Sequence, residues 1–268
     1  MLLLSLGLGA FGSLILLGAV QGITEFLPVS SSGHLALGGM LLGVGQASLV
    51  EDVALHVGTL LAVVVFYRKD LGRLLSGFLS PGAAGSSARR TIGLLLLANV
   101  PSGVIGIGFR HQFEVLFDRP GFIACAFAAT GAALLATRWA PRGEGEVGLK
   151  AALLMGAAQA VAILPGFSRS GWTIATALFL GVRPTDAARF SFLMSIPAIG
   201  GAALLQLREV EVSAAALLPM GAGVVTSALV GFVCLSWLVR LVRSMALHRF
   251  TPYLWALALG LGLWLLLR

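Results

Sequence analysis

The chain has 268 residues, of which 58% are hydrophobic and only 11% are charged, and its formal net charge is +7. So little polar surface excludes a soluble globular domain, and apolar runs of helical length without strand-like alternation favour an all-α polytopic membrane protein. The positive charge does not indicate nucleic acid as a partner, because the basic residues are scattered over short loops instead of being gathered on one face.

The first half of the chain predicts a short helical hairpin followed by three membrane spans. We take the run from Met1 as mature protein, because it lacks the basic start of a signal peptide. Two short apolar segments, 9–24 and 34–44, flank a polar stretch with Pro28 and three serines, residues that break or cap helices. This pattern favours a re-entrant hairpin that enters and leaves the membrane on one side. The full spans are expected at 50–67, 91–109 and 120–138.

The second half predicts the same order of elements. Segments 150–164 and 171–181 flank Pro165 and Gly166 and are expected to form a second re-entrant hairpin. Three further spans are expected at 187–206, 213–238 and 250–267, which gives about six transmembrane helices in all. The alternative is eight plain spans, in which the segment from Met1 to Thr24 crosses the membrane fully.

The two polar stretches are copies of each other at a constant offset of 138 residues. One reads GAVQGITEFLPVSSSG from Gly18 to Gly33, and the other reads GAAQAVAILPGFSRSG from Gly156 to Gly171. Because an odd number of crossings separates them, the second hairpin should enter from the opposite face. The sequence therefore predicts a single membrane domain, 1–268, with inverted-topology repeats at approximately 1–138 and 139–268.

The basic residues predict the orientation of the chain. Under the hairpin arrangement, thirteen of the eighteen Lys and Arg residues fall on one side of the membrane and four on the other. By the positive-inside rule the richer side is cytoplasmic, so both termini and the mouth of the first hairpin face outward. The richer side carries Arg68, Lys69, Arg73, Arg89, Arg90, Arg138, Arg142, Lys150, Arg183, Arg189, Arg240, Arg243 and Arg249, and the other side carries Arg110, Arg119, Arg208 and Arg268.

The second polar stretch, PGFSRSGWT from Pro165 to Thr173, has the parts of a phosphate site. It offers a guanidinium, hydroxyls and backbone amides exposed by glycines at an expected helix N-terminus. Arginine makes fork-like contacts to phosphate oxygens, and the positive end of a helix dipole adds to them. The alternative is that Ser168 and Ser170 only cap a helix while Arg169 pairs with Glu25.

The first polar stretch brings the groups that phosphoryl transfer needs into ten residues. A serine hydroxyl or an imidazole can attack phosphorus, a nearby base can take the hydroxyl proton, and a cation can balance the developing charge. Mg²⁺ or Ca²⁺ held by Glu25 and the phosphates would suit this last role. Gln21 lies one turn before Glu25 and shares its helix face. The candidate groups are Glu25, Ser30, Ser31, Ser32 and His34.

Histidines outside such a group carry less signal. Alone on an apolar helix, His34 would be read as a packing residue, but its polar neighbours make it a candidate catalyst. His56, with Glu51 and Asp52 at the start of the first full span, has no motif support and is expected to lie at the membrane interface.

The stretches QGITEFLPVSSSGH and PGFSRSGWT together closely resemble the undecaprenyl-pyrophosphate phosphatase family of the bacitracin-resistance type, whose signatures are an (E/Q)xxxE and a PGxSRSxxT element. The likeness covers essentially the whole chain. It implies a membrane phosphatase that hydrolyses undecaprenyl pyrophosphate to undecaprenyl phosphate and inorganic phosphate, recycling the lipid carrier for cell-wall synthesis. It also implies a bacterial cytoplasmic (inner) membrane location and a site open to the outer, periplasmic face, with the polyprenyl tail in an apolar groove between helices.

The resemblance also implies roles for individual residues. Because Gln21 stands where Glu is commoner, Glu25 would be either the base or the only protein carboxylate on a metal ion. Ser31 and His34 would belong to the catalytic centre, with Ser31 as the preferred nucleophile and His34 as the alternative, and Arg169 would hold the pyrophosphate. The expected substrate-binding residues are Gln21, Ser30, Ser32, Gly166, Ser168, Ser170 and Thr173.

Two other functions compete with hydrolysis. Inverted repeats with broken helices are typical of transporters, so a polyprenyl-phosphate flippase is the main alternative. A carrier needs no nucleophile, and the grouping of Glu25, Ser31 and His34 therefore favours an enzyme. A passive channel would need polar residues along a continuous path and fits least. The oligomeric state stays open, with a homodimer as one candidate.

Overall fold

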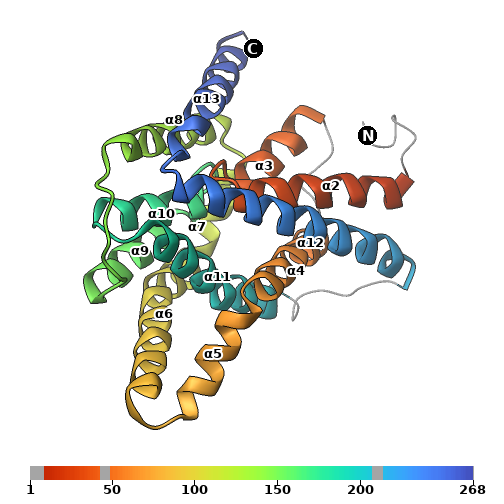
Figure 1. Cartoon of the computed structure of the whole chain (residues 1–268). Helices are drawn as coiled ribbons and strands as arrows, with labels where there is room; N and C mark the ends of the chain where they lie inside the picture. Colours follow the sequence, from red (N-terminus) through yellow and green to blue (C-terminus); the bar gives the residue numbers. More distant parts are fainter. Residues whose placement is uncertain (1–8, 43–48, 207–213, 268) are drawn as a thin grey trace.

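The computed structural model describes residues 9–42, 49–206 and 214–267, and this part of the chain is helical apart from turns, loops and one isolated bridge between Gly145 and Val182. It confirms the expectation of an all-α protein (Figure 1). In chain order the helices are α2 (Gly9–Phe26), α3 (Ser31–Leu42), α4 (Leu49–Phe66), α5 (Arg68–Leu79), α6 (Gly82–Gly108), α7 (Arg110–Phe117), α8 (Pro120–Ala136), α9 (Leu149–Val161), α10 (Arg169–Phe179), α11 (Pro184–Gln206), α12 (Ala214–Arg243) and α13 (Thr251–Leu266), with 3₁₀ turns η1 (Thr137–Trp139) and η3 (Leu247–Phe250).

Several helices are long and apolar enough to cross a membrane, which confirms a multi-pass protein. Within the described residues there are five, and a sixth if Val50–Phe66 and Arg68–Leu79, bent by 71° at their junction, count as one span. The unbroken five are Gly82–Gly108, Pro120–Trp139, Pro184–Leu205, Ala216–Arg243 and Leu247–Leu266. Arg208 and Arg268, which the sequence assigns to the side poorer in basic residues, lie outside the described residues. The start of the chain also lies outside them.

One span begins earlier than the apolar pattern predicts. The second predicted span starts at 91, whereas α6 starts at Gly82. Its polar first turns are held by Arg89, whose Nη1 donates to the carbonyls of Phe78 and Ser80 at 3.1 Å each. This side chain ties α6 to the end of α5. Hydropathy along the sequence does not predict a tertiary contact of this kind.

Both polar stretches interrupt short helices. Helices α9 and α10 contain 13 and 11 residues, so they are about 20 and 16 Å long, short of the roughly 30 Å of a bilayer core. Helices α2 and α3, with 18 and 12 residues, flank the first interruption. Pro28 and Pro165 lie in the two gaps, where the missing N–H of proline opposes continuation of a helix.

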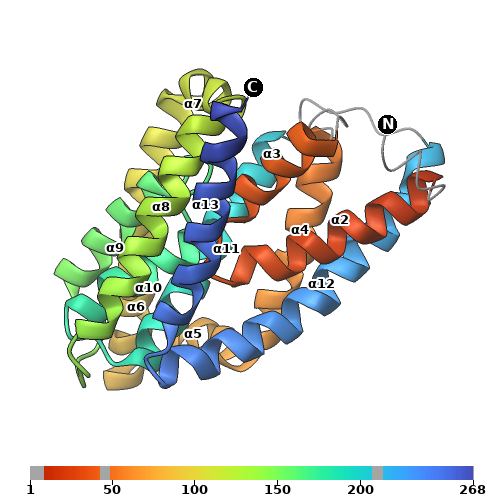
Figure 2. The same cartoon turned by 90° about the horizontal axis from the view of Figure 1, so that it is seen from above.

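The first helix of each broken pair packs along a long span. Helix α2 lies beside α12 (Figures 1 and 2), and α9 lies beside α6. A Cβ added at Gly18 would lie 3.3 Å from Gly223 Cα, and one added at Gly156 would lie 3.0 Å from Ala98 Cα. Both motif glycines therefore permit close backbone approach, which is how small residues promote helix packing in membranes.

Buried aromatic rings fix the ends of the broken helices. Phe26, the last residue of α2, is fully buried and packs edge-on against Phe192 of α11 with ring centroids 5.8 Å apart. Phe127 of α8 is also fully buried and lies behind α3. Because protein interiors are close-packed, Phe26 holds the first bend at the end of α2, and Phe127 holds the polar start of α3, at defined positions.

Candidate active site

The two polar bends meet inside the helix bundle. The Gly166 amide donates to Ser30 Oγ at 3.2 Å, and Ser170 Oγ donates to the Leu27 carbonyl at 3.4 Å. A Cβ added at Gly33 would lie only 3.0 Å from Gly166 Cα, so the close approach requires a glycine there. The two polar stretches, which are 138 residues apart in the sequence, therefore contact each other directly in the structure.

Glu25, in the last turn of α2, receives contacts from four side chains. Arg169 Nη2 donates to its Oε1 at 2.5 Å, and Ser31 Oγ donates to its Oε2 at 2.6 Å. Gln21 Nε2 donates to the same Oε2 at 3.3 Å, and His56 Nε2 lies 3.8 Å from it. The Glu25 side chain is only 8% exposed, and a carboxylate this buried persists only when it is paired and hydrogen-bonded.

Arg169 keeps an unused donor beside this carboxylate. Its Nη1 is buried and has no acceptor among the described residues, and Gln21 Oε1 is buried there without a donor. A buried guanidinium N–H without a partner is costly, and an anionic oxygen would satisfy it with a charge-assisted hydrogen bond. The site therefore offers a free donor for a phosphate oxygen next to the Ser31–Glu25 pair.

The serines of the two bends make the same local hydrogen bonds. Ser30 Oγ lies 3.2 Å from Ser32 Oγ and accepts from the amide three residues after it at 3.3 Å. Ser168 Oγ lies 3.3 Å from Ser170 Oγ and accepts from the amide three residues after it at 3.2 Å. Ser168 is thus the N-cap of α10, as the capping alternative expects. Ser30 has φ of 70°, a left-handed conformation that non-glycine residues adopt mainly at constrained sites.

Several groups expected to bind phosphate have protein partners instead. The amides of Gly166 and Gly171 are taken by serine hydroxyls, so the predicted cradle of glycine amides is not free. Thr173 Oγ1 donates to the Arg169 carbonyl at 2.7 Å and lies 2.7 Å from Ser191 Oγ of α11. Thr173 therefore anchors α10 to α11, and the group that keeps an unpartnered donor at the start of α10 is the Arg169 guanidinium.

His34 lies one turn after Ser31 on α3 but has different partners. Its Nδ1 donates to the Ser30 carbonyl at 2.7 Å, and its Nε2 lies 2.6 Å from Tyr253 Oη of α13. Both ring nitrogens are thus engaged away from the Glu25–Arg169 pair. Of the two candidate nucleophiles, Ser31 alone has a carboxylate within hydrogen-bond reach among the described residues.

Sequence reasoning missed His56. It was expected at the membrane interface, whereas the structure places its Nε2 3.8 Å from Glu25 and its Nδ1 2.9 Å from the Asp52 carbonyl and 3.5 Å from Asp52 Oδ1. No motif marks His56, because its role depends on α4 packing beside α2. The described surroundings of Glu25 thus include a second cationic partner when the imidazole is protonated.

Comparison with known proteins identifies the family. A family model described as bacitracin resistance protein BacA matches residues 14–260, which include both bends and all of the residues that contact Glu25, Arg169 or His34. The chain belongs to the BacA family. Its relatives include the undecaprenyl-diphosphatase of Rubrobacter xylanophilus, 43% identical over 91% of this chain and 94% of the relative. Those of Syntrophotalea carbinolica, 42% identical over 90% and 94%, and Desulfosudis oleivorans, 39% identical over 95% and 98%, carry the same name.

The oxygen atoms of this BacA site are compatible with a divalent cation that also binds the substrate. Mg²⁺ and Ca²⁺ prefer oxygen ligands, and Gln21 Oε1 is a buried acceptor with no donor among the described residues. Glu25 is the neighbouring carboxylate. The described residues contain no group of three or more His, Cys, Asp or Glu side chains that could hold a metal. An ion here would take most of its ligands from phosphate oxygens and water.

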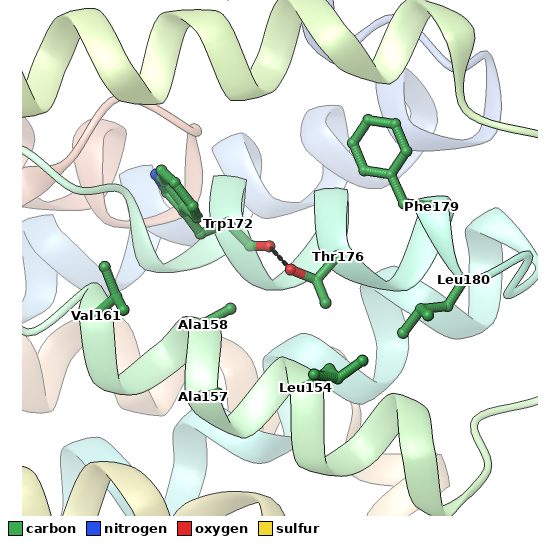
Figure 3. Close-up of a pocket in the computed structure, with 8 residues that line it drawn as sticks. All are labelled: Leu154, Ala157, Ala158, Val161, Trp172, Thr176, Phe179 and Leu180. Carbon is green, nitrogen blue, oxygen red and sulfur yellow. Dashed lines mark hydrogen bonds between the residues drawn. The ribbon is translucent and has the colours of Figure 1, made fainter.

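An apolar hollow of about 370 Å³ opens between α9 and α10 (Figure 3). Its one side-chain hydroxyl, on Thr176, donates to the Trp172 carbonyl at 2.8 Å and is thereby satisfied within its own helix. Trp172 follows Arg169 by three residues and connects the hollow to the second bend. The hollow is lined by Leu154, Ala157, Ala158, Val161, Trp172, Thr176, Phe179 and Leu180.

Proposed function

We infer that this chain is an undecaprenyl-diphosphatase, an integral membrane enzyme that hydrolyses undecaprenyl pyrophosphate to undecaprenyl phosphate and inorganic phosphate. The observation that carries this inference is the Ser31–Glu25–Arg169 arrangement, a hydroxyl 2.6 Å from a carboxylate that also faces a guanidinium with an unused donor. Relatives of about 40% identity bear the same activity in their names. A carrier would need no nucleophile and base, so the flippase alternative is not favoured.

In the proposed reaction, Ser31 Oγ attacks the terminal phosphorus while its proton passes to Glu25. The bond from that phosphorus to the bridging oxygen breaks, and undecaprenyl phosphate leaves with the electron pair. Arg169 Nη1 donates to the equatorial oxygens, where negative charge develops. Water then attacks the phosphoserine, which releases inorganic phosphate and returns the proton to Ser31. This sequence makes Ser31 the nucleophile and leaves His34 a supporting role.

We propose that a divalent cation, Mg²⁺ or Ca²⁺, binds with the substrate through Glu25 and Gln21 Oε1. When bound, it would neutralise negative charge on the diphosphate and the leaving phosphate. The orphaned Gln21 oxygen is the observation that supports this assignment. Gln21 also orients Glu25 through its amide donor at 3.3 Å.

We propose that residues 1–138 and 139–268 are inverted-topology repeats whose broken helices form two re-entrant hairpins. The recurring serine hydrogen bonds at a constant offset, and the matching packing of α2 on α12 and α9 on α6, support this arrangement. In Figure 2, α5 and the junction of α12 with α13 lie at the end opposite to α7. The α5 end carries many of the basic residues, so by the positive-inside rule this end would face the cytoplasm of a cytoplasmic-membrane protein. We propose that the site opens to the other, periplasmic side.

We propose that the polyprenyl tail occupies the apolar hollow between α9 and α10. The hollow adjoins the bend that carries Arg169, and its lining matches an isoprenoid chain in polarity. The tail would enter at Trp172 and extend along the two helices away from the diphosphate. Headgroup recognition would then lie at the N-terminus of α10 and tail recognition along the rest of that helix.

The activity is tested with purified protein in detergent. We expect phosphate release from undecaprenyl diphosphate with Mg²⁺ or Ca²⁺ and its loss on chelation with EDTA. Ser31→Ala should reduce turnover to background, and Glu25→Gln should reduce it by about 10²–10⁴-fold, the usual contribution of a general base. Ser236→Ala, which removes a half-buried hydroxyl that donates to the Phe232 carbonyl one turn earlier in α12, serves as the matched control. Full activity in Ser31→Ala would refute the assignment.

The tail site is tested with two neighbouring leucines of similar exposure. Leu154 lines the hollow and is 42% exposed, whereas Leu153 does not line it and is 41% exposed. Leu154→Trp should fill the hollow and raise KM for undecaprenyl diphosphate about tenfold, with little effect on farnesyl diphosphate. Leu153→Trp should change neither. Equal effects of Leu154→Trp on the long and short substrates would place the tail elsewhere.

A further inference from the structure

The imidazole of His34 is fixed by a tyrosine that no motif indicates. Tyr253 Oη lies 2.6 Å from His34 Nε2, and the two rings stack with centroids 5.7 Å apart and planes 9° apart. Phe127 packs edge-on against the same imidazole at 5.5 Å. The two hydrogen-bonded residues are separated by 219 positions in the chain, so the pair joins α3 to α13.

The hydrogen-bond partners determine the tautomer of His34. A backbone carbonyl can only accept, so the 2.7 Å contact to the Ser30 carbonyl requires the proton on Nδ1. In the neutral imidazole Nε2 then carries the lone pair and accepts from the Tyr253 hydroxyl. Nε2 is therefore the only nitrogen through which His34 can take a proton or meet a substrate oxygen, and Tyr253 is the group that holds it.

Tyr253 is itself held in place by the packing of its helix. Thr251 Oγ1 donates to the Gly131 carbonyl at 3.0 Å, and Trp255 Nε1 donates to the Ala128 carbonyl at 3.1 Å, so α13 is tied to α8 on both sides of Tyr253. Because Tyr253 is 46% exposed, its hydroxyl contributes little to the buried core. These contacts point to a local function for the hydroxyl instead of a packing function.

We propose that Tyr253 is a positioning residue for His34: its hydroxyl holds the imidazole with Nε2 directed toward α13, while the Ser30 carbonyl sets the Nδ1–H tautomer. Only the catalytic consequence of this positioning rests on the proposed phosphatase function. The geometric part is independent of substrate. Orientation of a histidine by a hydrogen bond to its second nitrogen is a recurrent means of setting which nitrogen reacts.

The first experiment measures the reactivity of Nε2 directly. Diethyl pyrocarbonate acylates unprotonated imidazole nitrogens, and mass spectrometry reports the rate at each histidine. Tyr253→Phe keeps the stacked ring and removes the hydroxyl, so His34 should react severalfold faster, while the His56 and His248 peptides serve as internal references. Tyr67→Phe, which removes the only other tyrosine hydroxyl of the chain, should leave the His34 rate unchanged. An unchanged rate in Tyr253→Phe overturns the proposal.

The second experiment separates positioning from helix docking. Tyr253→Phe should lower kcat about tenfold, the effect expected for loss of one hydrogen bond, and leave KM within twofold. Trp255→Phe removes one tether of α13, and because Thr251 still ties α13 to α8, this variant should leave kcat within twofold. In a His34→Gln background Tyr253→Phe should have no further effect, because the two act as one unit. Additive losses would assign Tyr253 a role independent of His34. A wild-type protein without phosphatase activity would refute the enzyme, whereas the labelling result would still stand.

Discussion

At the scale of single residues, the site depends on a carboxylate shared between a nucleophile and a guanidinium. Glu25 uses one oxygen for Ser31 and the other for Arg169, so the same side chain orients both groups that a phosphate would meet. Its burial makes each contact stronger than it would be in water, and it makes the loss of any partner costly. A conservative exchange at Arg169 should therefore separate charge from geometry.

Arg169→Lys keeps the positive charge but removes the planar fork. A single ammonium cannot hold Glu25 Oε1 and also present the donor geometry of the unused Nη1 to a phosphate oxygen. We expect kcat/KM to fall by about 10²-fold, of the order seen for one lost transition-state donor. Arg183→Lys, in an exposed pair with Asp186, is the control and should leave the rate unchanged. Steady-state kinetics measure kcat/KM of both variants. A fall of less than threefold in Arg169→Lys would contradict this expectation.

At the scale of elements, the backbones of the two bends approach each other most closely where a side chain is absent. Gly33 on α3 faces Gly166, and a Cβ there would also lie 2.7 Å from Phe127 Cζ. Gly38 lies on the same helix, and an added Cβ would have open space around it among the described residues. Gly33 and Gly38 of α3 thus offer a matched comparison of steric contact and helix propensity.

Gly33→Ala should destabilise the protein, because neither the Phe127 ring nor the Gly166 backbone can move without disturbing the site. Overpacking of this kind costs about 1–3 kcal/mol and lowers Tm by roughly 2–10 °C in a chain of this size. Gly38→Ala should keep or slightly raise Tm, because alanine favours a helix over glycine by roughly 0.5–1 kcal/mol. Thermal unfolding in detergent measures both. Equal Tm values for the two variants would show that the bends are less closely packed than described.

At the scale of the whole molecule, the distribution of charge and the position of the site predict one orientation in the membrane. Arg73 lies on α5, at the end of the molecule opposite to α7, and Arg119 follows α7; both side chains are exposed. With Cys125 and Cys234 replaced by Ala, an impermeant maleimide should label Arg119→Cys in intact cells but not Arg73→Cys. Lysed cells, in which both should react, provide the control. The reverse pattern would place the site on the cytoplasmic side.

The sequence by itself determined the membrane class, the approximate spans, the duplicated polar stretch and the identity of Glu25, Ser31 and Arg169 as one chemical group. These follow from hydropathy, from the cost of buried polar residues and from motif spacing, all of which are local properties of the chain. Only the tertiary structure decided which partners those groups have. In the structure the glycine amides donate to serine hydroxyls, and Thr173 contacts α11. His56 lies near Glu25, and Tyr253 contacts His34. Such contacts join helices that are far apart in the chain. They depend on how the helices pack, and the residues that make them show no periodic pattern in the sequence.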